Sequence, residues 1–533
     1  MFGGRDFPRI HDRPSLVSYI ERQLDADGCL PDPACPLPDE KPRTPGEISW
    51  MAGAFDGVMG HHMGGAGGAV NMAEQLARAI VTASAKPRQR QLTELYAMAS
   101  AEDVLTFIDP TIEALAEVRP PTSNVARIGA WLASESPDRG PVKVGMALLG
   151  ITGAPDGSVL HRLGAHEEFT LYAAVAFTNA RENPEPDLIE LAKRVHGWGR
   201  IHCVERLRDT TDPDVARWIL TEGFRNSIMN EYLAFIAATT GDLADALADP
   251  APDAEVLTAA SEIIDALIMG GPAEDIDDYA DAPIALARWL HHVRQAVASL
   301  GDFLTIRDIV AFCEREDWDE RLGRDTWDAN QRDEIRSTAE RLLERPDWAE
   351  LASLGLESDD PQEFWQAERA ARVLGLDAFP QLLARIDTDP LDGPWFQAWH
   401  GADDGRAQVL VDRAVRLLDL DGIATGPSTA IGMGPEFKRH AALNWTLQGL
   451  REHPDVRADL IIETAMKSPS IQNRNGALNL LEATGADGWS LEQRQLLADL
   501  ASTDPDEKVR GRAADLYASK DHRDWNRRRS TDT

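Results

Sequence analysis

The sequence contains little cysteine, and its few cysteines are widely spaced. Only 4 occur in 533 residues, at Cys29, Cys35, Cys203 and Cys313. They form no CxxC pair, which excludes a zinc ribbon or finger. Cys29 and Cys35 could form one disulfide bridge or none. Cys203 and Cys313 fall within helical patterns, and we expect them to be small buried side chains.

Long hydrophobic runs are also absent. The longest apolar stretches, such as LYAAVAF and YLAFIAA, are far shorter than the roughly 20 residues that a membrane-spanning helix requires. The N-terminal stretch MFGGRDFPRIHDRPS lacks the apolar core of a secretory signal. These observations predict a soluble, cytoplasmic protein without a membrane partner.

Positive charge and aromatic residues are scarce. The chain carries 54 Lys and Arg against 89 Asp and Glu, which gives a formal net charge of −35. Nucleic-acid binding usually requires a concentrated basic face, so this balance disfavours a nucleic-acid partner. Aromatic residues make up only 6 % of the chain, and many of the apolar residues are Ala and Leu. That composition favours close-packed helices over a β-rich core.

Helical periodicity dominates the chain from Gly46 onward, whereas residues 26–45 are Pro-rich and should be irregular. Segments such as TDPDVARWIL, HPDVRADLII and TDPDEKVRGR recur along the chain. Asp is a good N-cap and Pro fits the first helical turn, so we interpret these segments as helix starts. No alternating run is long enough to indicate a sheet. The pattern predicts an all-α fold with no significant β-sheet.

Internal repetition is the strongest signal in the sequence. The segments EFTLYAAVAFT, WGRIHCVERLR and IMNEYLAFIAA start 30 residues apart, and VKVGMALLGIT precedes the first by 26 residues. Each carries an apolar triplet at i, i+1 and i+4, the spacing of one helix face. The triplets are Ala147, Leu148 and Ile151; Ala173, Ala174 and Phe177; Cys203, Val204 and Leu207; and Leu233, Ala234 and Ala237.

A second repeat lies near the C-terminus. The pattern R-x-x-A-[AL]-x-L begins at Arg474 and again at Arg510, 36 residues later, with a looser copy at Lys438. This pattern resembles the second helix of HEAT-like repeats, over roughly residues 140–240 and 436–520. The resemblance implies a curved α-solenoid of stacked antiparallel helix pairs, which serves mainly as a binding surface and has no single activity.

Changes in composition predict five regions. They are an irregular Pro-rich arm, an N-terminal helical-repeat array, a less regular helical middle with a Gly-rich loop, C-terminal HEAT-like repeats and a disordered basic tail. Their ranges are 1–45, 46–316, 317–435, 436–520 and 521–533.

The stretch MGHHMGGAGG at 59–68 combines two histidines with a glycine cluster, and Asp56 precedes it. His61 and His62 are adjacent, so on a helix their side chains diverge by about 100° and cannot easily share a metal ion. The glycines lack both a preceding strand and a GK[ST] motif. We interpret the stretch as a helix stop and hinge, with Asp56, His61 and His62 as weak metal candidates. No metal or other cofactor is predicted.

The repeat helices also predict a binding column. Opposite the small apolar triplets, aromatic, histidine and acidic side chains occur at equal repeat positions, where a solvent-facing helix side would be charged. They could line a concave groove, or the helices could be packed on both sides. The candidate groove residues are Tyr172, His202, Glu205, Tyr232 and Phe235.

These features predict a non-catalytic helical-repeat scaffold that binds a protein or peptide, with a basic partner favoured by the acidic charge. We expect structural roles for Arg474, Arg510 and Arg200, each with an acidic partner. One alternative is an enzyme of unrecognised type, metal-dependent or hydrolytic, with a site near His61 and His62 or the 419–435 loop. Another is nucleic-acid binding in the manner of HEAT-like DNA glycosylases.

Overall fold

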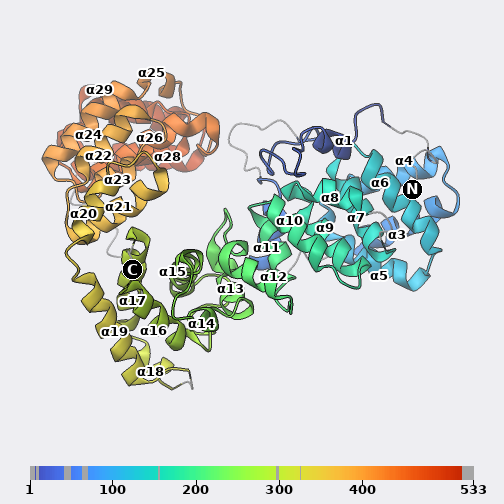
Figure 1. The fold of residues 1–533 in the computed structure, drawn as a ribbon. Helices are drawn as coiled ribbons and strands as arrows, with labels where there is room; N and C mark the ends of the chain where they lie inside the picture. Colours follow the sequence, from blue (N-terminus) through green and yellow to red (C-terminus); the bar gives the residue numbers. More distant parts are fainter. Residues whose placement is uncertain are drawn as a thin grey trace. The chain divides into compact units, whose positions relative to one another are not determined.

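The computed structural model describes residues 7, 11–40, 50–62, 70–101, 103–153, 157–295, 299–323 and 326–518, apart from the side chains of residues 60–62 and 70. These residues fall into two compact units, one ending at Trp348 and the other beginning at Ala349 (Figure 1). The two are called unit 1 and unit 2 below. The boundaries predicted from composition at 316 and 435 remain predictions, and the one at 520 lies outside the described residues.

The described residues of both units are helical, which confirms the predicted all-α fold. They contain no strand, and the one bridge among them joins Ala430 and Ser470. The α-helices of unit 1 are α1 (Leu16–Glu21), α2 (Ala54–His62), α3 (Val70–Ala85), α4 (Gln89–Ala99), α5 (Ile108–Val118), α6 (Thr122–Glu135), α7 (Arg139–Ile151), α8 (Ser158–Gly164), α9 (Glu167–Ala180), α10 (Glu185–Arg194), α11 (Trp198–Glu205), α12 (Pro213–Trp218), α13 (Ala234–Thr240), α14 (Leu243–Ala246), α15 (Ala254–Met269), α16 (Ala282–Val293), α17 (Leu300–Cys313), α18 (Trp318–Arg321) and α19 (Ala329–Leu343).

The α-helix that begins at the unit boundary and those of unit 2 are α20 (Trp348–Gly355), α21 (Pro361–Leu374), α22 (Phe379–Thr388), α23 (Trp395–Trp399), α24 (Asp404–Leu417), α25 (Leu420–Ile423), α26 (Lys438–Gly449), α27 (Asp459–Met466), α28 (Ile471–Thr484), α29 (Leu491–Thr503) and α30 (Glu507–Ala518). Short 3-10 turns are η2 (Val104–Thr106), η4 (Asn230–Tyr232), η5 (Pro435–Phe437), η6 (Leu450–Glu452) and η7 (Ala486–Gly488), and η3 (Ile219–Gly223) is a π-helix.

Each unit has the packing of a helical-repeat array. Consecutive helices such as α6 and α7, or α29 and α30, pack as pairs, and alternate helices pack from one pair to the next. The alternate rows run α7–α9–α11 and α15–α17–α19 in unit 1 and α26–α28–α30 in unit 2. Since the connections within pairs are short, paired helices run antiparallel. Each pair buries its apolar face against its neighbours, as solenoid repeats do.

Small apolar side chains form the contacts between successive repeats. The triplets within 168–238 are fully or almost fully buried, as the periodicity predicted. The earliest triplet differs, because Leu148 is buried but Ile151 is 39 % exposed at the end of α7. The third repeat also starts later than predicted, with η4 at Asn230–Tyr232 and the α-helix only from Ala234.

Only some of the predicted helix starts are correct. Asp212 caps α12 by accepting hydrogen bonds from the backbone N–H groups of Asp214 and Val215, and Pro213 is its first residue. By contrast, Pro454 and Pro505 lie outside helices, and the following helices begin at Asp459 and Glu507. In these two segments a later residue starts the helix, so the proline marks the preceding turn.

Candidate functional site

The predicted groove column is largely packed inside unit 1. Tyr172, His202 and Tyr232 are each only 5 % exposed, whereas Glu205 and Phe235 are partly exposed. The ring of Trp198 lies 6.2 Å from His202 and 5.0 Å from Tyr232, measured between centroids. The helices are therefore packed on both sides at Tyr172, His202 and Tyr232, and the column remains a prediction as a binding surface.

The metal candidates are only partly described. Asp56 lies in α2, is 3 % exposed and pairs with Lys143, whose Nζ is 2.9 Å from its Oδ2. His61 and His62 are the last residues of α2, and their side chains lie outside the described residues. No group of three or more His, Cys, Asp or Glu side chains that could hold a metal occurs in the part of the chain that the structure describes.

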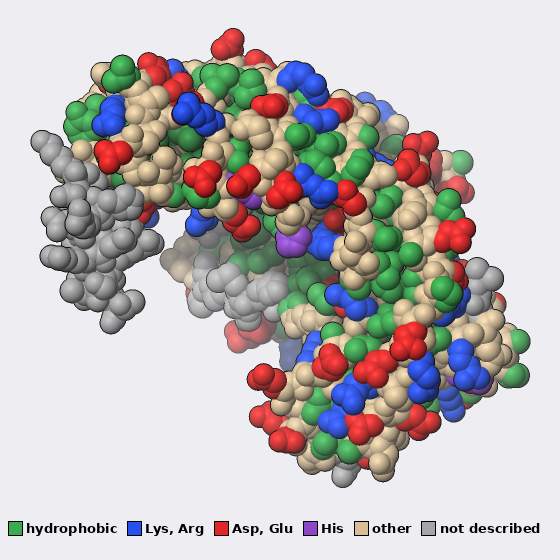
Figure 2. Space-filling model, turned by 90° about the vertical axis from the view of Figure 1, so that its left-hand side faces the viewer, with side chains coloured by type: hydrophobic (Ala, Val, Ile, Leu, Met, Phe, Trp, Pro, Cys, Tyr) green, Lys and Arg blue, Asp and Glu red, His purple; other side chains and the backbone are tan. Residues whose placement is uncertain are grey.

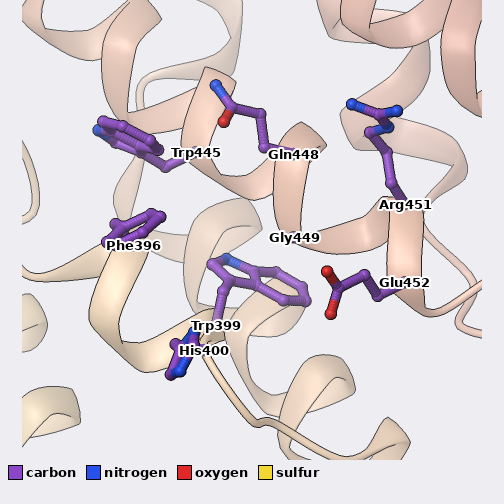
Figure 3. Close-up of a pocket in the computed structure, with 8 residues that line it drawn as sticks. All are labelled: Phe396, Trp399, His400, Trp445, Gln448, Gly449, Arg451 and Glu452. Carbon is purple, nitrogen blue, oxygen red and sulfur yellow. The ribbon is translucent and has the colours of Figure 1, made fainter. Parts of the chain in front are cut away.

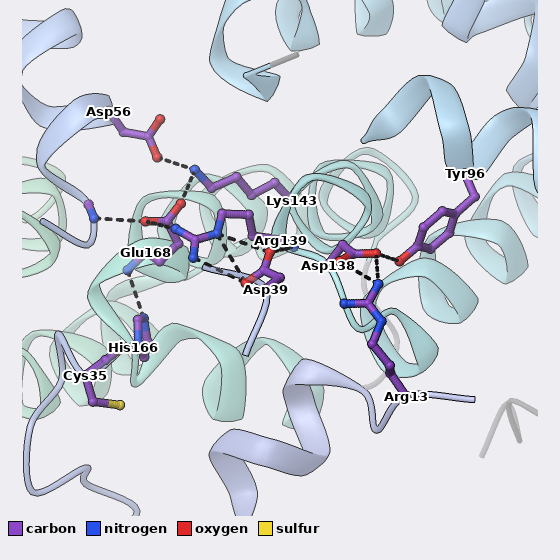
Figure 4. Close-up of polar contacts among 11 residues, drawn as sticks. Arg13, Cys35, Asp39, Asp56, Tyr96, Asp138, Arg139, Lys143, His166 and Glu168 are labelled. Atoms are coloured by element: carbon purple, nitrogen blue, oxygen red, sulfur yellow. Dashed lines mark hydrogen bonds and ion pairs between the residues drawn. The ribbon is translucent and has the colours of Figure 1, made fainter. Parts of the chain in front are cut away.

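A buried charge network was not foreseen from the sequence. Lys143 in α7 lies between two carboxylates, with its Nζ 2.9 Å from Asp56 and 2.8 Å from Glu168 of α9 (Figure 4). The Nζ also lies 4.9 Å from the centre of the Tyr172 ring, a cation–π contact. Glu168 accepts a further hydrogen bond from the backbone N–H of Gly53. These contacts join α2, α7 and α9 through ionic groups.

The neighbouring charges set the protonation of this network. Burial alone would lower the pKa of Lys143, but Tyr172, Glu168 and Asp56 together raise it well above its ordinary value. Burial would raise the pKa of Glu168, yet Lys143 and Arg139 hold it below its ordinary value. For Asp56, burial outweighs the attraction of Lys143, so its pKa is raised. The Lys143–Glu168 pair is therefore the fixed ionic contact, and Asp56 is the more easily protonated carboxylate.

The neighbouring Glu167 has a structural role. Its carboxylate accepts hydrogen bonds from the backbone N–H groups of His196, Gly197 and Gly199 at the start of α11. An anion at this position satisfies the free N–H groups of a helix start and complements the helix dipole. Glu167 thus links the α9 repeat to the α11 repeat.

The arginines of the repeat pattern also have structural roles. Arg474 is fully buried and forms two hydrogen bonds with Asp504, of 2.8 Å and 3.1 Å, as the pattern predicted. Arg510 donates to the backbone oxygen of Asp504 and lies 3.9 Å from Glu507. For Arg200 the expectation was wrong, because its guanidinium donates to the carbonyls of Ala192, Val195 and Arg225. Backbone carbonyls replace the expected carboxylate.

The segment 419–435, predicted as a Gly-rich loop, begins with the short helix α25, and its later part is fixed to the turn before α28. Gly426 N–H donates to the Lys467 carbonyl, and Ser428 Oγ donates to the Pro469 carbonyl. The Ser428 carbonyl in turn accepts a hydrogen bond of 2.7 Å from Arg474. The observed contacts of this loop are therefore structural.

The cysteines form no disulfide bridge between Cys29 and Cys35, which are free thiols. Cys203 and Cys313 are buried, as predicted.

An aromatic cleft lies in unit 2, where α23 meets α26 and η6. The cleft has a volume of about 460 Å³. Phe396 and Trp445 lie side by side at its edge, with ring centroids 5.3 Å apart, and are 51 % and 39 % exposed. Figure 3 shows both rings above Trp399, with Arg451 and Glu452 on the opposite side. Its lining residues are Phe396, Trp399, His400, Trp445, Gln448, Gly449, Arg451 and Glu452. We call this site the aromatic cleft.

Trp399 forms the base of the aromatic cleft. Its ring lies directly against Gly449, where an added Cβ would be 2.1 Å from a ring carbon. The His453 ring lies 6.0 Å from the Trp399 ring, measured between centroids. The Nδ1 atom of His453 bonds to Asp404 at 2.7 Å. Trp399 is only 5 % exposed, and its indole N–H has no hydrogen-bond acceptor among the described residues. A buried donor without an acceptor is costly, so a ligand oxygen that reached this N–H by displacing the covering side chains would stabilise it.

Sequence reasoning missed this cleft for a simple reason. Phe396 and Trp399 belong to the run PWFQAWH, whereas Trp445 lies in a separate repeat helix. Only the tryptophan-dense composition of 395–399 hinted at an interaction site, because the exposure of each ring depends on tertiary packing.

On the face drawn in Figure 2, acidic and basic side chains are interspersed, and hydrophobic ones appear between them. None of the described helices has both the length and the apolar character needed to cross a membrane.

Comparison with known proteins gives little further information. The chain matches no family model, and no curated protein is similar to it in sequence. Among solved structures it is similar to a circular tandem repeat protein with novel repeat topology and enhanced subunit contact surfaces, at 15 % identity and a TM-score of 0.13, covering 85 % of this chain and 96 % of that one. A TM-score this low carries no inference. The helix contacts themselves define an all-α helical-repeat protein, and the HEAT-like resemblance remains a prediction.

Proposed function

We propose that this protein is a non-catalytic helical-repeat scaffold, and that the aromatic cleft of unit 2 binds an extended segment of a partner protein. The observation that carries the proposal is the unpaired Trp399 indole N–H beneath the exposed Phe396–Trp445 pair. Exposed aromatic side chains around a cleft are typical energetic centres of protein interfaces. Repeat arrays commonly present such surfaces.

The chemistry of the aromatic cleft favours a proline-containing segment. Extended polyproline II segments dock on aromatic-lined grooves because the rings of Pro pack on flat aromatic faces. Their carbonyl oxygens are free of internal hydrogen bonds, so one can accept from the Trp399 indole. The exposed rings of Phe396 and Trp445 offer flat faces for Pro, and the indole N–H of Trp399 offers the hydrogen bond.

Charge favours basic residues beside the prolines. The net charge of −35 attracts cationic partners at long range, and Glu452, next to Arg451, provides a carboxylate at the cleft. A protein or peptide with Arg or Lys next to its prolines is therefore the proposed partner. The predicted column in unit 1 is not the proposed site, because Tyr172, His202 and Tyr232 are buried.

Calorimetric titration with short synthetic peptides tests this function. A Pro-x-x-Pro peptide with two flanking Arg residues should bind, and replacing its prolines by Ala or its arginines by Glu should weaken binding. The double variant F396A/W445A should reduce affinity by at least about tenfold, because the rings supply the contact area. W50A is the matched control, since Trp50 is 50 % exposed in unit 1 and outside the cleft.

Several results would contradict the proposal. They are equal binding of the proline and alanine peptides, unchanged affinity in F396A/W445A, or an equal loss in W50A. Tight, salt-sensitive binding of duplex DNA without peptide binding would favour the nucleic-acid alternative instead.

A further inference from the structure

A second surface, in unit 1, is lined by several basic side chains. A groove of about 560 Å³ lies between α16 and α19. Its lining residues are Pro283, Ile284, Ala287, Arg288, Leu290, His291, Arg294, Gln331, Glu334, Ile335, Thr338 and Arg341. Glu334 is the one carboxylate in this set, against three arginines and a histidine. We call this site the α16–α19 groove.

The cationic side chains of the α16–α19 groove are not neutralised by neighbouring acids. Arg288 donates to the backbone oxygen of Ala244, and Arg341 donates to Thr338 Oγ1 at 2.9 Å. Neither these two arginines nor Arg294 forms an ion pair with any carboxylate that the structure describes. In a chain where most described arginines near the surface have an acidic partner, three unpaired guanidinium groups along one groove constitute a local positive field.

The groove also has an apolar floor. Leu290 and Ile335 are buried at its base, and Ile284 is 43 % exposed at its side. Positions 284, 287, 291 and 294 of α16 are spaced at three or four residues, so they follow one helix face. From Ile284 to Arg294 the rise of α16 is about 15 Å, or nearly three helical turns. Ile284 and Ala287 therefore form an apolar half of this face above the buried Leu290 and Ile335, and His291 and Arg294 continue it as a polar, basic half.

We propose that the α16–α19 groove binds an acidic amphipathic helix of a partner protein. Such a helix lays its apolar face on the floor of a groove and places side-chain carboxylates against flanking cations. This surface lies in a different unit from the aromatic cleft and shares no lining residue with it, so the proposal does not depend on the function proposed above.

A small free anion fits the groove less well. Anion sites usually use the unpaired N–H groups of helix starts, whereas Arg294 and Arg341 lie at the C-terminal ends of α16 and α19. Those ends carry the negative side of the helix dipole and offer carbonyl groups. The apolar part of the groove around Ile284 and Ala287 would also remain uncovered. A helix that presents several carboxylates and an apolar face satisfies both parts of the groove.

The test uses three fluorescein-labelled peptides and the full-length protein. The first has Leu at helical positions i, i+3, i+4 and i+7, flanked by Glu. The second has Lys in place of every Glu, and the third has a central Pro that breaks the helix. Fluorescence anisotropy should show that the first binds with a Kd below about 100 µM, that binding weakens as salt rises, and that the other two bind at least about tenfold more weakly.

Charge reversal in the groove provides the matched comparison. R294E/R341E should weaken binding of the Glu peptide by at least about tenfold and strengthen binding of the Lys peptide. The control R22E/R88E carries the same change in charge at two exposed arginines of unit 1 that do not line the groove, and it should bind like the wild type. Circular dichroism checks that the variant folds. Stronger binding of the Lys peptide is a second check, because it requires a folded groove.

Defined outcomes would overturn the proposal. They are equal binding of the Glu and Lys peptides to the wild type, equal binding of the Pro-containing peptide, or the same loss in the control variant. Complete displacement of the Glu peptide by millimolar inorganic phosphate would assign the groove to small anions instead. If R294E/R341E does not fold, the peptide comparison and salt series on the wild type still decide the question.

Discussion

At the scale of single residues, the buried ions of unit 1 depend on one another. Lys143, Asp56 and Glu168 are all less than one-tenth exposed. A buried charge is tolerated because its partner offsets the loss of hydration, so removing one partner leaves the other uncompensated. Sequence patterns cannot reveal such a cluster, since Asp56 lies 87 residues before Lys143.

Replacing Lys143 by Met should strongly destabilise unit 1. The K143M change removes the cation shared by two buried carboxylates and leaves only Arg139 near Glu168, and the expected loss in the free energy of unfolding is about 3–5 kcal/mol. Urea denaturation followed by circular dichroism measures this loss. The control R78M removes a pair between exposed Arg78 and Glu74 and should cost less than about 1 kcal/mol. Equal losses in the two variants would contradict the interpretation.

His166 should make the stability of unit 1 fall in mild acid. Burial lowers the pKa of His166 below its ordinary value of 6.5. The unfolded chain therefore binds the proton first, and stability is lost as pH falls below about 6.5. Protonation would also occupy Nδ1, which accepts the hydrogen bond from the Glu168 N–H that caps α9.

The variant H166N tests this pH dependence. Asn is a good N-cap without a titrating ring, so the decline in unfolding free energy between pH 7 and 5 should be shallower than in the wild type. H291N, at an exposed histidine, should keep the wild-type decline. A wild-type slope in H166N would show that other groups cause the acid sensitivity.

At the scale of helices, glycines let tryptophan rings lie against helix backbones. Gly449 of α26 accommodates Trp399, and Gly57 of α2 accommodates Trp198 in the same way. In both cases an added Cβ would come within 2.1 Å of a ring carbon. This close approach, rather than backbone flexibility, explains why glycine occupies these helical positions.

Gly449→Ala should therefore reverse the usual effect of this substitution. Ala is favoured over Gly in a helix by about 1 kcal/mol, but here the methyl group would displace Trp399 and cost about 1–3 kcal/mol. Gly511→Ala in α30 is the matched control, because its Cβ would meet nothing within 4 Å and should stabilise the protein. Thermal denaturation compares the two variants, and stabilisation by both would refute the packing argument.

Much of the helical framework could be predicted, because apolar spacing alone determines which face is buried. Segment 168–178 falls in α9, segment 198–208 covers α11 and the turn after it, and the Arg474 and Arg510 patterns fall in α28 and α30. The start of α13 could not be predicted, since residues 228–233 have helical composition but form a turn. The aromatic cleft and the Lys143 network depend on contacts between repeats, which periodicity within one helix does not specify.

The middle of the chain shows a repeat that the periodicity did not identify. The motif E-R-x-D-W occurs at 314–318 and again at 344–348. In both copies the tryptophan is buried and its indole donates to a backbone carbonyl six residues earlier, from Trp318 to Phe312 and from Trp348 to Leu342, each at 2.9 Å. The same kind of turn thus follows the C-terminal ends of α17 and α19, so the part of the chain around these two helices is also built from repeated units.

At the scale of the whole molecule, contacts are concentrated within units 1 and 2. Calorimetry should show more than one unfolding transition, as expected for a chain with separate compact units. K143M should lower the temperature of one transition, and G449A should lower that of another, because Lys143 and Gly449 lie in different units. A single transition shifted equally by both variants would instead show that the chain unfolds as one cooperative unit.

The recurring contact from one helix row to the next has an evolutionary consequence. A duplicated repeat carries both the face that its predecessor requires and the face that its successor requires. Repeats can then be gained or lost between existing ones with modest damage to the core, while surface side chains change independently. The aromatic cleft and the α16–α19 groove could have been acquired separately in such a chain, each by substitutions confined to a few neighbouring helices.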